Sequence, residues 1–160
     1  LGLTCSTKTV FLDLSARGQS IGRVFIRVMG DRPHGQQFIM LVLGTEGPTY
    51  KGTKFTVESC GNFGIGIQKY ITESGPISDE PLLATLKPVK YDIGLRGWLV
   101  PNWSEKGTFM IVTQNKEKNR FHGHFGDVIT GLEVIDRAAS SEFNITDVTI
   151  SECGIVLDNK

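Results

Sequence analysis

The stretch Val10-Phe11-Leu12-Asp13-Leu14 alternates apolar residues that share one face with residues of mixed polarity. Because successive side chains of a strand point to opposite faces, this alternation predicts a half-buried β-strand. A second alternating stretch runs from Gly22 to Met29, and Arg17-Gly18 lies between the two as a turn. The two stretches therefore predict a β-hairpin. The residues expected to face inward are Val10, Leu12, Leu14, Val24, Ile26 and Val28.

Beyond the hairpin the chain is a succession of short strand-like segments and loops. Three prolines between Ser74 and Pro88 indicate a long surface connection. Because strands do not alternate regularly with helices, the pattern predicts an all-β fold, a closed antiparallel barrel, rather than a parallel sheet. The predicted strands are 55–57, 63–71, 97–100, 108–113, 124–129 and 148–150.

Two helices are predicted to cap this barrel. The first starts at Pro33 and ends at Gly44, with Phe38, Leu41 and Val42 at the spacing of one helix face. Its other side is also apolar, which leaves two interpretations open: a helix buried all round, or a helix with a docking surface. The second helix opens at Gly131. Its apolar face is predicted to contain Leu132, Ile135 and Ala139.

Composition and charge exclude several classes of function. Seventeen Lys and Arg balance seventeen Asp and Glu over 160 residues, so the net charge is zero. A grip on nucleic-acid phosphates or on anionic lipid normally needs a clustered basic excess, and we expect neither partner. No run approaches the 18 or more apolar residues of a spanning helix. The length fits one domain, which we assign to residues 1–160.

The cysteines indicate a reduced, intracellular protein, in the cytoplasm or the nucleus. Cys5, Cys60 and Cys153 are odd in number and form no CxxC pair. Two glycosylation sequons, at Asn102 and Asn144, point the other way, but such tripeptides often arise by chance. The chain begins at Leu rather than Met, from which we expect a piece of a longer protein.

Six stretches, in this order, resemble the cyclophilin family of peptidyl-prolyl isomerases. The resemblance extends from about Lys8 to Leu157, the core of the assigned domain, and is weakest in the middle of the chain. It implies a closed, eight-stranded antiparallel barrel with an α-helix at each open end. The matching stretches are Val10–Leu14, Ile21–Val24, Tyr50–Phe55, Phe109–Thr113, Phe125–Val128 and Ile150–Gly154.

The same resemblance implies that the catalytic residues are lost. Rotation about an X-Pro bond faces a barrier of ~18–20 kcal/mol, and cyclophilins lower it with an arginine in a Phe-His-Arg segment. That segment is Phe55-Thr56-Val57 here, so the arginine position holds Val57, which has no donor. The family's glutamine position holds Gly66. Losing one preorganised donor typically costs ~2.7–4 kcal/mol of transition-state stabilisation. With both positions changed we expect little catalysis, and we assign no catalytic residue.

Cyclophilins bind the proline ring of their substrate in a groove, and what remains of this groove is expected to bind a protein without catalysing isomerisation. A pocket-floor phenylalanine of the family is replaced by Met110, and His124 is aligned with the family's pocket histidine. The residues that the resemblance assigns to the groove are Val57, Phe63, Asn102, Met110, Phe121 and His124.

A second set of residues suggests an interface outside the groove. Ile39, Val42 and Leu43 match helix positions that are usually polar in the family, and Phe25 replaces a small polar residue on an outward strand position. Trp103, in a polar turn, is a further candidate anchor. Either a partner or neighbouring domain covers them, or a remodelled barrel packs them internally. Trp98 is expected in the core.

Neither a metal nor another cofactor is expected. His122 and His124 have strand spacing on one face, which is half of a metal site, but no third ligand lies nearby in the sequence. The sequence therefore predicts a catalytically inactive, cyclophilin-like protein-interaction domain of a larger protein. The alternatives are a weak peptidyl-prolyl isomerase that acts through the apolar pocket, or a purely structural domain held by its helix face.

Overall fold

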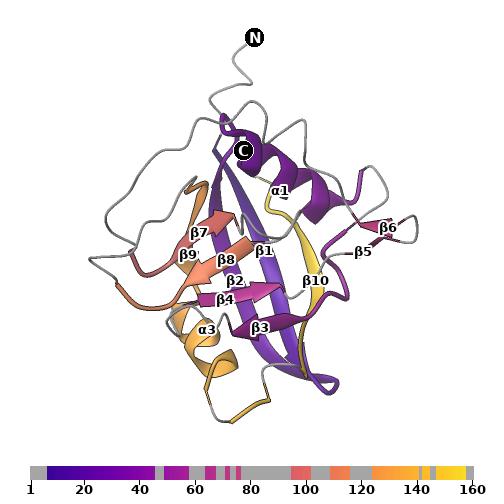
Figure 1. The fold of residues 1–160 in the computed structure, drawn as a ribbon, viewed down its shortest axis with the longest axis vertical. Helices are drawn as coiled ribbons and strands as arrows, with labels where there is room; N and C mark the ends of the chain where they lie inside the picture. Colours follow the sequence, from indigo (N-terminus) through magenta and orange to yellow (C-terminus); the bar gives the residue numbers. More distant parts are fainter. Residues whose placement is uncertain are drawn as a thin grey trace.

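In the computed structural model, the part of the chain that is described is mainly β and includes the helices α1 and α3 (Figure 1). None of the described helices is long and apolar enough to cross a membrane. The structure describes residues 7–45, 49–57, 64–67, 71–72, 75–76, 95–101, 109–115, 124–140, 142–144 and 147–157.

The predicted hairpin is present and consists of the two longest strands described, β1 (Thr7–Ala16) and β2 (Gln19–Met29). Ala16 pairs with Gln19, so two residues make the turn. Both have positive φ, 51° at Arg17 and 78° at Gly18. Such a turn matches the right-handed twist of the flanking strands, and glycine takes its second position without strain.

The inward face of the hairpin is as predicted. The six alternating residues are at most 1% exposed and belong to the main hydrophobic core. β10 (Val148–Ile155) pairs antiparallel with β1 on the side away from β2. It is longer than the predicted strand at 148–150, because it continues through Cys153 and Gly154. Gly154 lies close to the Phe11 ring, from which a Cβ at this position would be 2.9 Å away, so a larger residue would have to displace that ring.

The remaining strands of the main sheet are shorter. In the described part of the chain the sheet order is β10-β1-β2-β9-β7-β8-β4-β3, with every pairing antiparallel. The short strands are β3 (Phe55–Val57), β4 (Gly64–Ile67), β7 (Trp98–Pro101), β8 (Phe109–Val112) and β9 (Gly126–Thr130).

The two outermost strands of this sheet approach each other. Lys54, just before β3, forms an isolated antiparallel bridge with Thr149 of β10. The Gly52 N–H donates to the Ile150 carbonyl at 2.7 Å, and the Ile150 N–H donates to the Thr53 carbonyl at 2.9 Å. We call this contact between 52–54 and 149–150 the seam. The antiparallel, mainly-β fold is confirmed, and complete closure into a barrel stays a prediction that the seam supports.

Helix α1 (Pro33–Leu43) packs against β2 and β10. It begins at Pro33, as predicted, and ends at Gly44, whose φ of 69° permits its N–H to donate to the Met40 carbonyl. The glycine at position 35 permits the helix to lie close to the end of β2. A Cβ on Gly35 would be only 2.1 Å from the Met29 carbonyl oxygen. Phe38 is buried among the rings of Tyr50, Phe109 and Phe125.

Helix α3 (Leu132–Ala138) packs against β2. Ile135 is buried as predicted, but the apolar face ends at Ala138 rather than at Ala139. Ala139 caps the helix and is exposed, because the helix is one residue shorter than the periodicity suggested. Gly131 has a φ of 102° before the first turn.

The connection predicted between Ser74 and Pro88 lies mostly outside the described residues. At its start, β5 (Ile71–Thr72) and β6 (Gly75–Pro76) form a small antiparallel pair apart from the main sheet (Figure 1).

Candidate functional site

Strands β3, β4 and β8 bring together the positions to which the resemblance assigns catalytic residues. Gly66 of β4 pairs with Thr56 on one side and with Met110 of β8 on the other. Val57 pairs with Ile65, one position along. A glycine has no side chain, so nothing extends from the sheet where the family carries its glutamine.

Strands β7 and β8 have a buried cluster on each face. Leu99 and Ile111 pair with each other and belong to the main core, with 0% exposure. Val100 and Val112, which point to the opposite face, form a second buried cluster with Trp98 and Met110 packed against it. We call Trp98, Val100, Met110 and Val112 the outer cluster. It lies on the side of the sheet away from the main core, and only its Trp98 and Met110 side chains are partly exposed.

His124 extends the outer cluster through Trp98. The imidazole and indole rings are stacked, with centroids 4.0 Å apart and an interplanar angle of 13°. His124 Nε2 lies 3.1 Å from Asp127 Oδ1. A side-chain N–H of Arg32, at the N-terminus of α1, donates to the His124 carbonyl. Trp98 of β7 and Asp127 of β9 therefore hold the imidazole in place, and Arg32 holds the backbone of the same residue.

The environment of His124 keeps its ring uncharged. Only 8% of the residue is exposed, and this burial lowers its pKa below the ordinary 6.5. Asp127 acts in the opposite direction and Arg32 lowers the pKa further, with a net decrease. The imidazole is therefore neutral at pH 7. We assign its proton to Nε2, where it can be donated to the Asp127 carboxylate.

Of the predicted groove residues, Met110 and His124 lie together at the outer cluster, connected by Trp98. Val57 lies on β3, which is separated from β8 by β4. Phe63, Asn102 and Phe121 lie outside the described residues.

Two residues of this site were missed in the sequence. Trp98 was expected in the core, but it is half-buried on the outer face, two residues before Val100. The alternation Trp98, Val100 was visible, although the sequence does not indicate which face of a strand is covered. Asp127 follows His124 by three residues, and this spacing was the available signal for their contact.

The predicted interface residues have different surroundings. Phe25 is partly buried, paired with Phe11 across the hairpin, and Ile39 is partly buried against the core. Val42 is 3% exposed and lies within the core, so as a surface residue it must be corrected: its spacing from Phe38 puts it on the buried face. Leu43 is 48% exposed, beside Met40 at 36%. Trp103 lies outside the described residues.

The described part of the chain contains no group of three or more side chains able to hold a metal. His122, the second half of the predicted pair, lies outside it. The ring of His124 contacts Trp98 and Asp127. Cys153 is a partly buried free thiol, and burial raises its pKa, which disfavours the reactive thiolate.

A solved structure with this fold is known. The chain is similar to the crystal structure of the Mimivirus cyclophilin, with a TM-score of 0.66 and 23% sequence identity over 95% of this chain and 90% of that one. At this identity the match establishes a cyclophilin-like fold. No protein-family model matches the sequence. No curated protein matches it either.

Proposed function

We propose that the chain is a protein-interaction domain in which a cyclophilin-like fold has lost its isomerase chemistry. The observation that carries this proposal is the register of the short strands. Gly66 lies between Thr56 and Met110, and Val57 lies on the same strand as Thr56. The two positions where the family places its glutamine and arginine thus hold residues without a hydrogen-bonding side chain, within an otherwise ordered sheet.

The outer cluster favours binding over catalysis. It offers a thioether, an indole and a neutral imidazole, which can enclose an apolar group such as a proline ring. A twisted amide, however, must be stabilised by a donor preorganised in the transition state. The Arg32 side chain donates to the carbonyl of His124, and we infer that it does not take the role of the lost arginine.

The decisive experiment is an isomerisation assay on an X-Pro peptide, followed by NMR exchange so that no coupling protease is needed. We expect no acceleration over the uncatalysed rate at micromolar protein. The matched variant, Val57→Arg with Gly66→Gln, returns both side chains and should give a measurable rate. Turnover by the unmodified chain comparable to an ordinary cyclophilin would falsify the proposal.

A weak isomerase that acts through the apolar surface alone is the second candidate, and the intact outer cluster is what favours it. The two candidates differ in their response to Met110→Trp, which enlarges a partly buried side chain of the cluster. If a residual rate exists, this substitution should abolish it. If the domain only binds, there is no rate to abolish.

We propose a partner protein or a neighbouring domain of a longer chain, in an intracellular compartment, as the binding target. Two surfaces compete for this role, the outer cluster and the exposed side of α1 with Met40 and Leu43. Met110→Asp and Leu43→Asp separate them in partner-recovery experiments. Loss of the partner with Met110→Asp alone supports groove binding, and loss with Leu43→Asp alone supports a structural domain held by its helix face.

A further inference from the structure

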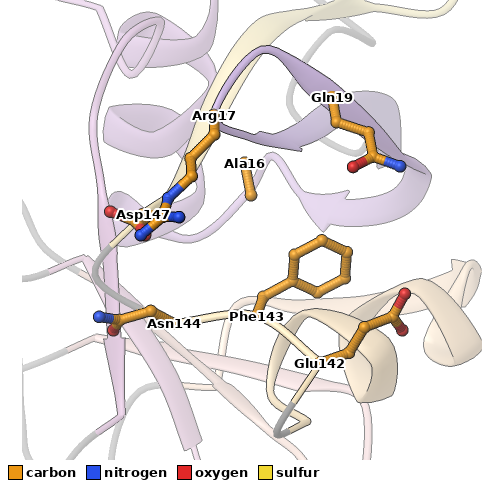
Figure 2. A pocket seen from close by; sticks show the side chains of 7 residues that line it. All are labelled: Ala16, Arg17, Gln19, Glu142, Phe143, Asn144 and Asp147. Carbon is orange, nitrogen blue, oxygen red and sulfur yellow. Dashed lines mark hydrogen bonds and ion pairs between the residues drawn. The ribbon is translucent and has the colours of Figure 1, made fainter.

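A pocket of about 250 Å³ lies between the turn of the β1–β2 hairpin and the segment that follows α3 (Figure 2). Such a volume is below the ~300–1,000 Å³ of sites for small molecules and cofactors, so it suits a single inserted side chain. Its lining residues are Ala16, Arg17, Gln19, Glu142, Phe143, Asn144 and Asp147.

The pocket combines an apolar wall with a rim that carries two carboxylates. Figure 2 shows the Phe143 ring projecting into the space below Ala16, while the polar side chains surround it. The charged lining residues are one cation, Arg17, and two carboxylates, Glu142 and Asp147, and Arg137 beside the lining pairs with Glu142, so two cations face two carboxylates. A side chain with an apolar stem and a positive head fits both features.

The two carboxylates are not equally available. Glu142 is held by a fork, because Arg137 Nε and Nη2 donate to its two oxygens at 3.1 and 2.9 Å. Among the residues that the structure describes, the Asp147 carboxylate pairs with Arg17, whose Nε donates to Oδ2 at 2.9 Å. The Arg17 side chain is 81% exposed, and exposed ion pairs of this kind contribute little. Asp147 is therefore the carboxylate that an external cation can take.

Two guanidinium groups of this chain already lie at the pocket. Arg17 pairs with Asp147, and the Arg137 guanidinium lies over the Phe143 ring at 5.3 Å from its centroid. Arg17 also has a φ of 51°, a left-handed conformation that costs an arginine free energy and that glycine adopts freely. An unfavourable backbone position thus holds the one side chain that screens Asp147.

We propose that this pocket binds a basic side chain, an arginine or lysine of a protein partner, and that Arg17 is an exchangeable internal occupant of the same carboxylate. The incoming head group pairs with Asp147, and its stem lies on Phe143 and Ala16. The pocket is built from residues separate from the outer cluster. Its failure would therefore leave the proposed function of that cluster untouched, and the reverse also holds.

The test is NMR titration of the 160-residue chain with N-acetyl-arginine amide. N-acetyl-norleucine amide, which has an apolar stem without a charge, and N-acetyl-aspartate amide, which has the opposite charge, are the control probes. We expect saturable shifts at the backbone amides of Gln19, Phe143 and Asp147 with the arginine probe, and none with the other two. Arg17→Gly removes the competitor and suits the positive φ, so it should tighten binding by about two- to fivefold. Arg17→Lys, which keeps a competing cation, should tighten it much less.

Asp147→Asn should abolish the response to the arginine probe. Glu133→Gln on α3 is the matched control, because it removes one exposed carboxylate outside the pocket, and it should leave the response unchanged. Equal loss with both variants would reduce the effect to general electrostatics and overturn the proposal. So would an Arg17→Gly variant that shows no shifts, or binding of the aspartate probe instead. Because Arg17→Gly tests the site with Asp147 intact, misfolding of Asp147→Asn would not prevent a decision.

Discussion

The strands on the two sides of the sheet differ in length. β1 and β2 have 10 and 11 residues and pair along their whole length, whereas β3 has 3 residues and β4, β7 and β8 have 4 each. We call β1, β2 and β10 the long-strand region, and β3, β4, β7 and β8 the short-strand region. The first carries the most specific part of the resemblance, and the second carries the positions to which the resemblance assigns the family's catalytic residues.

This difference bears on the proposal that the fold has outlasted a catalytic site. Alternate side chains are buried in β1 from Val10 to Ala16 and in β2 from Val24 to Val28, and a slip of one residue would expose them, so the register is strongly specified. In the short-strand region Gly66 lies in a register held by buried neighbours such as Ile111. Under the proposed function, replacement of polar groups there removes the isomerase chemistry without removing the core.

Phe38 tests how far the two regions depend on one core. Its ring centroid lies 4.9 Å from that of Phe109 in β8 and 5.4 Å from that of Phe125, next to β9. Phe38→Ala should lower the free energy of unfolding by about 3–5 kcal/mol through lost burial and a cavity. Urea unfolding measured by tryptophan fluorescence and by far-UV circular dichroism checks this. Leu43→Ala, on the exposed side of the same helix, should change stability by less than about 0.5 kcal/mol. Separate transitions for the two probes would contradict a shared core.

The approach of α1 to the long-strand region can be broken at Gly35. A methyl group there meets the Met29 carbonyl oxygen, which belongs to backbone and cannot move away alone. Gly35→Ala should therefore destabilise the fold by about 1–3 kcal/mol, despite the better helix propensity of alanine. Thermal unfolding measures the effect. Gln36→Ala, at an exposed position next in the helix, is the control, and an equally stable Gly35→Ala variant would mean that α1 does not lie this close to β2.

The His124 environment predicts a pH dependence that belongs to the short-strand side. Its pKa is lower in the folded chain than the ordinary 6.5, so the unfolded chain binds more protons as the pH falls through that value. Stability should thus decrease from about pH 6.5 downward until the lower, folded pKa is passed. Urea unfolding across pH 4.5–8 of the unmodified chain and of His124→Phe isolates this residue. If stability rises on acidification relative to the variant, the ring is stabilised in its charged form.

The smallest effect is expected at the contact between α3 and the loop before β7. Arg96 donates to both oxygens of Asp136 at 2.7 and 2.6 Å and to the Thr113 carbonyl at 2.8 Å. The pair is largely exposed, so Arg96→Lys should cost no more than about 0.5–1 kcal/mol, less in high salt. Arg96 lowers the pKa of Asp136, so this contribution should also fade as the pH falls toward 3.8 and below. Equal losses in low and high salt would contradict an ionic origin.

The alternation of apolar residues predicted the hairpin and its inward face, because period-two burial follows directly from strand geometry. Pro33 and Gly44 likewise marked the ends of α1. The spacing of Val42 from Phe38 already placed it on the buried face of α1. The sequence could not show that Ile39 is partly buried while Leu43 is exposed, since both are apolar and the difference depends on the rotation of the helix against the sheet. The stack of Trp98 on His124 was also out of reach, because it joins separate strands through tertiary packing.

The seam has a consequence for the order of folding. It joins 52–54 to 149–150 and is held by few hydrogen bonds between segments far apart in the chain. Contacts of this kind pay the entropy of closing a long loop and gain little until the rest is in place. We expect the hairpin to form early and the seam to close last, and the amide hydrogens of Gly52 and Ile150 to exchange with solvent sooner than those inside the hairpin. The last contact formed on folding would then also be the first to open in the native molecule.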